Sequence, residues 1–168
     1  MTLAIRPALE TEIDAIRDLE RASSRRFLGV MDALAADDPT PASVLADRIA
    51  AGGLLAALMD GTLAAFVMFR PLEDSLYIEQ IDVAPTFEGR RIGAALIDAV
   101  AERAASAGLA RLTLSTFRDV PWNAPYYRRL GFVDIADVAL SDALLAVRRE
   151  HEARGLDERA RLFMRRPV

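Results

Sequence analysis

Two adjacent arginines stand where a helix is predicted to begin, in the stretch EGRRIGAAL of residues 88–96. Positive charge is unfavourable there, because the helix macrodipole favours anions at the N-terminus. The same terminus offers unpaired backbone N–H groups, and Gly89 and Gly93 allow a ligand to approach the backbone closely. Arg90 and Arg91 therefore indicate an anion site of the kind that holds phosphate. The alternative is a glycine-containing helix start with solvated arginines, and this motif alone does not decide between the two.

Glu79 is the carboxylate best placed to act as a base. It lies in the run LYIEQIDV of residues 76–83, which reads as a strand. The residues on its face of a strand with a period of two are Tyr77, Ile81 and Val83. A carboxylate on this mostly apolar face can accept a proton in general base catalysis. The alternative is a structural or substrate-binding carboxylate. Asp82 lies on the opposite face and is the weaker candidate.

Several residue types are absent, and their absence narrows the chemistry. The chain has no cysteine, and all 21 basic residues are arginine. Disulfides, a thiolate nucleophile, a Schiff-base lysine and the P-loop lysine are therefore excluded. The single histidine, His151, is predicted to be exposed on a charged helix and not to be catalytic, and no metal site is predicted. No stretch resembles a membrane span, and the first residues lack the layout of a signal peptide, so we expect a cytoplasmic protein.

Charge is distributed unevenly along the chain. The net charge of −4 divides into 7 arginines against 14 acids over residues 1–84, 7 against 4 over residues 85–131, and 7 against 7 over residues 132–168. The basic centre suits an anionic partner, and the acidic first half suits a cationic one, such as an amine. Solvated surface charge is the alternative explanation.

The pattern of apolar residues predicts alternating strands and helices. Strands are predicted at residues 3–8, 54–59, 62–70, 76–83, 110–117, from 132 onward and at 160–166. Helices are predicted at residues 11–28, with Thr11 as a cap, 40–51, 89–107, 121–131 and 141–155, with Ser141 as a cap. Asp60 and Gly61 join two apolar runs as a hairpin. At 168 residues with no repeat or linker, we expect a single domain, residues 1–168, of α/β class around a mixed sheet.

Two motifs in fixed order give a family resemblance. LYIEQIDVAPTFEGRRIGAAL and, one strand later, PWNAPYYRRLGF together resemble the GNAT family of acetyl-CoA-dependent N-acetyltransferases. EGRRIGA is similar to the pyrophosphate loop of that family, Q/R-x-x-G-x-G/A, and PYYRRLGF is similar to its late tyrosine motif. The chain departs from the loop pattern at Glu88, where glutamine or arginine is usual, and at Arg91, where glycine is commoner. The resemblance is strongest over residues 63–133 and implies a largely antiparallel mixed sheet flanked by helices.

The resemblance implies a cofactor clamp for acetyl-CoA and direct transfer of its acetyl group to a primary amine. The clamp comprises the end of the strand (Ile81, Asp82, Val83) and the loop with the helix start (Glu88, Gly89, Arg90, Arg91, Ile92, Gly93, Ala94, Ala95). In the family, the backbone at the end of this strand pairs with the pantetheine arm, and an N–H near Val83 polarises the thioester carbonyl. The acceptor is a small molecule or a peptide amine.

The resemblance also assigns the acid. Tyr127, four residues before Gly131, matches the family's tyrosine, and a phenol can protonate the departing thiolate. Its alternative role is that of an aromatic core residue, for which Tyr126 is the better candidate. Asn123 lies one helical turn before Tyr127 and is a candidate contact to the pantetheine arm, with a helix cap as its alternative. Candidates for contacts to the acceptor are Glu79, Ser115, Thr116 and Trp122.

Three rival functions remain open at this stage. A non-catalytic acetyl-CoA-binding or sensing protein of the same fold is the main alternative. A dinucleotide-binding oxidoreductase would need G-x-G-x-x-G after the first strand, which is absent. A nucleic-acid binder would need a basic stripe with aromatics, which the net charge and the acidic first half argue against. By family resemblance we expect a homodimer through the C-terminal strands.

Overall fold

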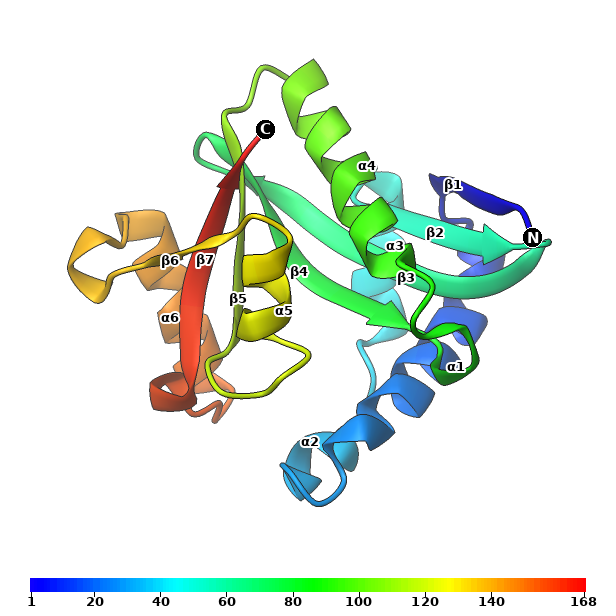
Figure 1. Ribbon diagram of the computed structural model, residues 1–168, viewed down its shortest axis with the longest axis horizontal. Coiled ribbons are helices and arrows are strands. Elements are labelled where there is room, and N and C mark those ends of the chain that lie inside the picture. The colour runs from blue at the N-terminus through cyan, green and yellow to red at the C-terminus, as the bar shows by residue number, and fades with distance from the viewer. The chain divides into compact units, whose positions relative to one another are not determined.

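The computed structural model describes all residues, 1–168 (Figure 1). Its strands are β1 (Leu3–Pro7), β2 (Leu54–Met59), β3 (Thr62–Leu72), β4 (Ser75–Val83), β5 (Arg111–Phe117), β6 (Val133–Ile135) and β7 (Arg161–Pro167). Its α-helices are α1 (Ile13–Ser24), α2 (Asp32–Ala35), α3 (Ala42–Ala50), α4 (Ile92–Ser106), α5 (Ala124–Arg129) and α6 (Asp142–Ala153). Short 3-10 turns lie at Glu10–Glu12, Arg25–Phe27, Pro85–Phe87, Asp137–Ala139 and Glu158–Ala160.

The strands pair in the order β1-β2-β3-β4-β5-β7-β6. β1 with β2, β2 with β3, β5 with β7 and β6 with β7 are antiparallel. β4 and β5 are parallel, with Ser75 opposite Arg111. A parallel pair needs a crossover connection, and α4 supplies it. The predicted fold class, an α/β fold with a mixed and largely antiparallel sheet flanked by helices, is confirmed.

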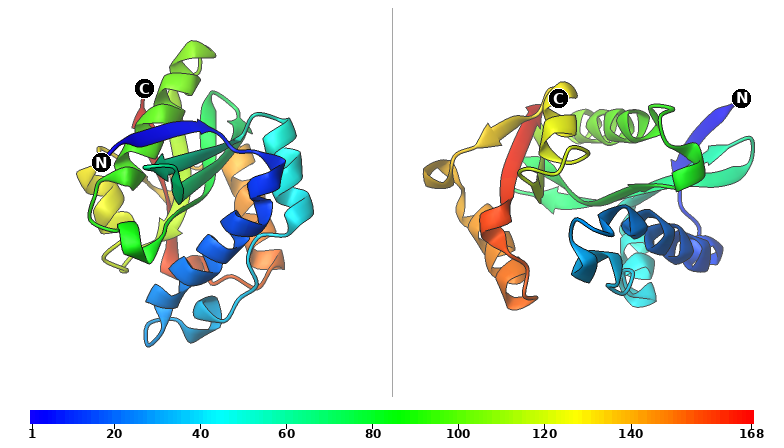
Figure 2. Two further views of the ribbon diagram at one scale, coloured as in Figure 1. Left: turned by 90° about the vertical axis from the view of Figure 1, so that its right-hand side faces the viewer. Right: turned by 60° about the horizontal axis from the view of Figure 1, so that its bottom comes forward.

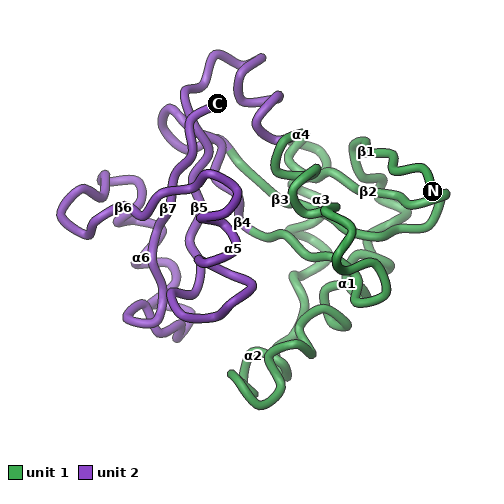
Figure 3. Tube along the Cα trace, in the orientation of Figure 1, with its two compact units in different colours: residues 1–70, 80–99 green, residues 71–79, 100–168 purple.

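The chain divides into two compact units (Figure 3). Unit 1 comprises residues 1–70 and 80–99, and unit 2 comprises residues 71–79 and 100–168. β4 contributes its first part to unit 2 and its last part to unit 1, and α4 is divided between them as well.

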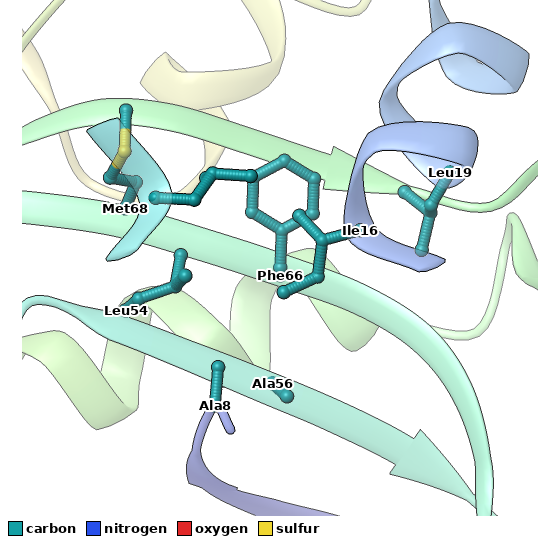
Figure 4. Close-up of a cluster of buried hydrophobic side chains, with 8 residues drawn as sticks. Ala8, Ile16, Leu19, Leu54, Ala56, Phe66 and Met68 are labelled. Carbon is teal, nitrogen blue, oxygen red and sulfur yellow. The ribbon is translucent and has the colours of Figure 1, made fainter. Parts of the chain in front are cut away.

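Unit 1 has its own apolar core. In this unit α1 and α3 lie on one face of the strands, and the first half of α4 lies on the other (Figure 2). Ile16 and Leu19 of α1 point toward Phe66 of β3 (Figure 4). These three side chains are buried in a cluster that also holds Ala8, Leu45, Leu54, Ala56 and Met68. The spacing of Ile16 and Leu19, which predicted a helix, gives α1 the apolar face that this core requires.

Unit 2 is organised around α6. Leu144 and Val147 of α6 pack with Tyr77 of β4, Ile135 of β6 and Phe163 of β7. The helix begins where the sequence predicted, because the Ser141 side chain accepts a hydrogen bond from the Leu144 backbone N–H at 3.2 Å. The predicted Ser141 cap is thus confirmed.

Local sequence signals were accurate for the hairpin and wrong for one helix start. Asp60 and Gly61 both have positive φ, 49° and 83°, as a type I′ turn requires. Thr11, however, is not a cap: it lies inside a 3-10 turn, and the N-cap position of α1 is Glu12. The Glu12 carboxylate instead accepts a hydrogen bond from the Leu9 N–H at 2.8 Å. Arg6 holds the Glu12 side chain in this position, because it donates hydrogen bonds to both Glu12 oxygens. Its charge and these bonds hold the pKa of the Glu12 carboxyl below its usual range.

Candidate functional site

The glycine–arginine loop lies in unit 1, between the end of β4 and the start of α4. β4 ends at Val83, a 3-10 turn follows, and α4 begins at Ile92. Gly89 has φ of 75°, and a Cβ built on it meets no atom within 4 Å. The first N–H groups of an α-helix have no acceptor within the helix. The loop therefore presents backbone donors at the start of a 15-residue helix, next to an open face at Gly89.

Arg91 adopts a backbone conformation that usually selects glycine. Its φ is 59°, in the left-handed region, whereas Arg90 is not among the residues with positive φ. A left-handed conformation costs a residue with a Cβ about 1–2 kcal/mol. This geometry explains why glycine is the commoner residue at the fourth position of the loop pattern. An arginine at this position is therefore expected to be less stable than a glycine would be.

The two arginines are exposed and carry the positive charge of the loop. The Arg90 guanidinium lies 5.4 Å from the centre of the Phe87 ring, and its Nη1 contacts the Met1 sulfur at 2.9 Å. α4 starts one residue after Arg91, so both arginines precede the first helical residue and do not lie within the helix as expected. Exposed guanidinium groups beside helix N–H donors form an arrangement suited to a phosphate.

Arg26, which sequence reasoning missed, joins the loop to the end of β4. It follows α1 in the 3-10 turn, and its Nη2 donates to the Val83 carbonyl at 3.3 Å and to the Ser23 hydroxyl at 2.6 Å. The same Nη2 lies 3.5 Å from a Glu88 carboxylate oxygen. The unexpected acid of the loop thus has a cationic neighbour. Arg26 is 57 residues from Val83 in sequence, and no local pattern marks such a contact.

A partly buried acidic cluster, Asp82 with Glu20, lies beside Arg26 in unit 1. Asp82 accepts hydrogen bonds from Ser23 at 2.8 Å and from Gln80 at 2.5 Å. Burial raises the pKa of the Asp82 carboxyl, against the opposing effects of these bonds and of the Arg26 charge. Burial also raises the pKa of Glu20, and the nearby Asp82 charge adds to this. Asp82 is thus held by Ser23 of α1 and by Gln80 of its own strand.

In unit 2, Tyr127 lies on the short helix α5. Its ring makes edge contacts with Tyr126, at 5.4 Å between centroids, and with Phe132, at 5.8 Å. Tyr126 and Tyr127 are both partly buried, whereas Phe132 is fully buried. The aromatic neighbours fix the position of the Tyr127 ring, and partial exposure leaves it accessible.

Asn123 stands at the N-cap position of α5, but its side chain makes no capping bond. Its backbone carbonyl accepts the Tyr127 N–H at 3.0 Å, which places the two residues one turn apart as predicted. Trp122 and Glu79 are partly buried. Thr116 is buried near the end of β5, so of the two predicted hydroxyls there only Ser115 is partly exposed.

The prediction that His151 is exposed was wrong. The ring is buried, with 8% of the residue exposed, and it stacks against Phe163 of β7 at 6.4 Å. Its Nδ1 lies 2.6 Å from a Glu158 carboxylate oxygen, and burial raises the pKa of Glu158. The apolar contact comes from a strand that follows later in the chain, which the charged helix sequence does not reveal.

Arg161, at the start of β7, is a second residue that sequence reasoning missed. Its Nε and Nη2 donate to the hydroxyl and carbonyl of Ser115 at 3.2 and 3.3 Å. Its guanidinium lies over the Phe117 ring at 4.7 Å. Strand pairing across β5 and β7 brings these residues together, since Phe117 is opposite Arg161.

None of the helices combines the length and the hydropathy that a membrane-spanning segment requires.

Comparison with known proteins identifies the class of protein that has this order of strands, a loop of this kind before α4 and a tyrosine on α5. The class is that of the acyl-group transferases. The model of the acetyltransferase (GNAT) family matches residues 13–132, more than half of the chain. The chain therefore belongs to the GNAT acetyltransferase family, and the resemblance stated from the sequence is confirmed.

Solved structures show the same fold at low sequence identity. The chain is similar to the PaiA N-acetyltransferase of Thermoplasma acidophilum in complex with coenzyme A, with TM-score 0.74, 14% identity and 100% of both chains covered. It is also similar to N-acetylglutamate synthase of Neisseria gonorrhoeae complexed with coenzyme A and N-acetyl-glutamate, with TM-score 0.76 and 17% identity, covering 100% of this chain and 35% of that one. The ribosomal-protein-S18-alanine N-acetyltransferase of Escherichia coli matches with TM-score 0.66 and 17% identity, over 99% of this chain and 94% of that one.

Proposed function

We propose that the chain, as one domain over residues 1–168, is an N-acetyltransferase that moves the acetyl group of acetyl-CoA to a primary amine. Family membership supports acetyl transfer. The observation that carries the choice of cofactor is the loop before α4, where two exposed arginines and the helix N–H groups surround the open side of Gly89. A pyrophosphate fits this donor set. The left-handed conformation of Arg91 supports it further, because it fits the fourth position of the loop pattern, where glycine is the commoner residue.

All predicted site residues except Thr116 have a role in this proposal. The backbone of residues 81–83 and 88–95 holds the cofactor, with the side chains of Arg90 and Arg91 facing the phosphates. Asn123, whose amide makes no capping bond, is available to the pantetheine arm. Ser115, Trp122 and Glu79, which are partly exposed, contact the acceptor, whereas the buried Thr116 does not. The cytoplasmic location and the homodimer stay predictions.

The transfer itself needs three groups of this chain. Acetyl-CoA supplies the acetyl group as a thioester. Glu79 accepts the proton that the amine nitrogen loses as its bond to the carbonyl carbon forms. The N–H near Val83 donates to the carbonyl oxygen, where negative charge develops. Tyr127 gives its phenolic proton to the sulfur as the carbon–sulfur bond breaks.

The test is acetyl-CoA-dependent release of free thiol across a panel of amines, amino acids and peptides. We expect thiol release with at least one acceptor, and a loss of kcat of about 10²-fold or more in Glu79→Gln and in Tyr127→Phe, the range of a general acid or base. Tyr126→Phe is the matched control, because it removes the neighbouring phenol from the same helix and should retain kcat. Isothermal titration with coenzyme A measures cofactor binding separately.

Each alternative has its own result. Binding of acetyl-CoA without thiol release from any acceptor favours the non-catalytic acetyl-CoA sensor. Absence of coenzyme A binding contradicts the assignment of the loop. Equal loss of kcat in Tyr126→Phe and Tyr127→Phe contradicts a specific role of the Tyr127 phenol as the acid, because the two hydroxyls of α5 would then be equally important.

A further inference from the structure

Arg161 is held rigidly at the end of β5, within unit 2. Strand pairing places it opposite Phe117, its guanidinium covers that ring, and two of its nitrogens donate to Ser115. A guanidinium has five N–H donors, and these two contacts use only two of them. The remaining donors are fixed in direction by the ring below and by the serine beside them.

The charge of Arg161 is not neutralised by an ion pair. No carboxylate of the chain lies within 4 Å of it, and burial lowers the pKa of its guanidinium. The charge of the Glu158 carboxylate raises the pKa of the Arg161 guanidinium. Glu158 itself, however, is hydrogen-bonded to His151 at 2.6 Å. The charge of Arg154 lowers the pKa of the Arg161 guanidinium, and Arg118 donates a hydrogen bond to the Arg161 backbone carbonyl. A partly buried cation without a carboxylate partner costs folding free energy.

The position of this cation is close to the predicted chemistry. Its hydrogen-bond partner, Ser115, is a predicted acceptor contact. Tyr77 and Tyr127 are near enough for their ionised forms to raise the pKa of this guanidinium. Tyr127 is the predicted acid. The unpaired guanidinium thus lies in the part of unit 2 where the acceptor is expected.

We propose that Arg161, supported by Ser115, binds a carboxylate of the acceptor. The acceptor is then an amine that also carries a carboxylate, either a free amino acid or a peptide with its own C-terminal carboxylate. A guanidinium matches a carboxylate with paired N–H donors, and such charge-assisted bonds are strong in a partly buried site. The ligand would supply the negative charge that the protein itself does not. This assignment rests on the proposed acetyltransferase function.

Matched acceptors test the carboxylate directly. The panel holds the L-amino acids and their carboxamides, and lysine-containing peptides with a free or an amidated C-terminus. We measure kcat/KM for acetyl transfer with wild type, Arg161→Gln and Arg118→Gln. Arg118 is the matched control, because it is an exposed arginine that contacts Arg161 only through its carbonyl. In parallel, isothermal titration with coenzyme A present in excess measures binding of the same acids and amides.

We expect wild type to prefer the acid over its amide by about 10- to 100-fold, the range of a hydrogen bond to a charged group. In Arg161→Gln this ratio should fall to about one while kcat/KM for the amide is retained, and Arg118→Gln should keep the wild-type ratio. The two arms of the panel show whether the carboxylate belongs to an amino acid or to a peptide C-terminus.

Other results overturn the assignment. Equal use of acids and amides by wild type, or absence of selective binding and selective turnover across the panel, removes the carboxylate site. A loss in Arg161→Gln that is equal for acid and amide shows a structural role only. Selective binding of acids by wild type but not by Arg161→Gln, without any thiol release, supports the carboxylate site and contradicts the acetyltransferase function.

Discussion

At the scale of single residues, Arg91 shows function and stability in conflict. Its φ of 59° is costly for arginine, and we propose that its charge faces phosphate. Arg91→Gly should therefore raise the free energy of unfolding by up to about 1 kcal/mol and weaken coenzyme A binding several-fold. Urea unfolding and isothermal titration with coenzyme A measure the two effects.

Arg90 provides the control for Arg91, because it is the adjacent exposed arginine without positive φ. Arg90→Gly should weaken coenzyme A binding without any gain in stability. If Arg91→Gly lowers the free energy of unfolding, the left-handed conformation of Arg91 does not cost stability. If it leaves coenzyme A binding unchanged, the charge of Arg91 does not contribute to phosphate binding.

The sequence predicted residue roles only where a local pattern specifies them. Asp60 and Gly61 predict the turn because their backbones tolerate positive φ. Ser141 predicts the start of α6 because its hydroxyl can accept a hydrogen bond from a backbone N–H of the first turn. His151 was predicted to be exposed, because the strand residue that covers it, Phe163, is twelve positions away and pairs with it only in the folded chain. Arg161 was missed for the same reason, since its neighbours are on another strand.

At the scale of elements, Arg26 connects the turn after α1 with the end of β4 and the loop before α4. It bonds the Val83 carbonyl and lies 3.5 Å from the Glu88 carboxylate. Without Arg26, the Glu88 charge would be left beside the proposed phosphate site. We therefore expect Arg26→Ala to weaken coenzyme A binding about tenfold, and Glu88→Gln to restore part of that loss in the Arg26→Ala background.

A double-mutant cycle on coenzyme A affinity, measured at low salt, tests this element-scale interaction. Glu88→Gln alone should leave the affinity unchanged or raise it, because it removes a negative charge. Restoration by Glu88→Gln identifies charge as the cause. If the changes in binding free energy of the two single variants simply add in the double variant, Arg26 acts only through its contacts with Ser23 and Val83.

The elements themselves were largely predictable, and their ends were not. Apolar periodicity predicted the strands and most helices, since it reflects which side faces the core. The strand predicted from residue 132 onward ends at Ile135, and a 3-10 turn follows at Asp137–Ala139. The apolar run there continues without a partner strand, because β6 pairs with β7 over three residues only. Pairing, which ends a strand, is not a local property.

At the scale of the whole molecule, partly buried carboxyls should make stability depend on pH. Burial raises the pKa of Asp82 and Glu20 above their unfolded values. In that case the folded state binds more protons than the unfolded state, and the free energy of unfolding falls as pH rises from about 4 through the folded pKa values. Each pKa unit of difference corresponds to about 1.4 kcal/mol.

Asp82→Asn isolates this contribution. The difference in free energy of unfolding between wild type and Asp82→Asn, followed by urea unfolding from pH 4 to pH 9, should move in favour of the variant as pH rises. Glu158 retains its own raised pKa in both proteins and cancels in the difference. A difference that is constant over this range would show that Asp82 titrates at its unfolded value.

The chain passes between the two units three times, and each passage lies inside a regular element. The passages fall within β3, within β4 and within α4, at residues 70–71, 79–80 and 99–100. No single cut of the polypeptide, in a gene or by a protease, can release either unit as a continuous fragment. Half-length clones and split-protein reporters divided at one point should therefore yield pieces that each lack part of a unit. Evolution by exchanging one unit for another would need two separate segments to change together.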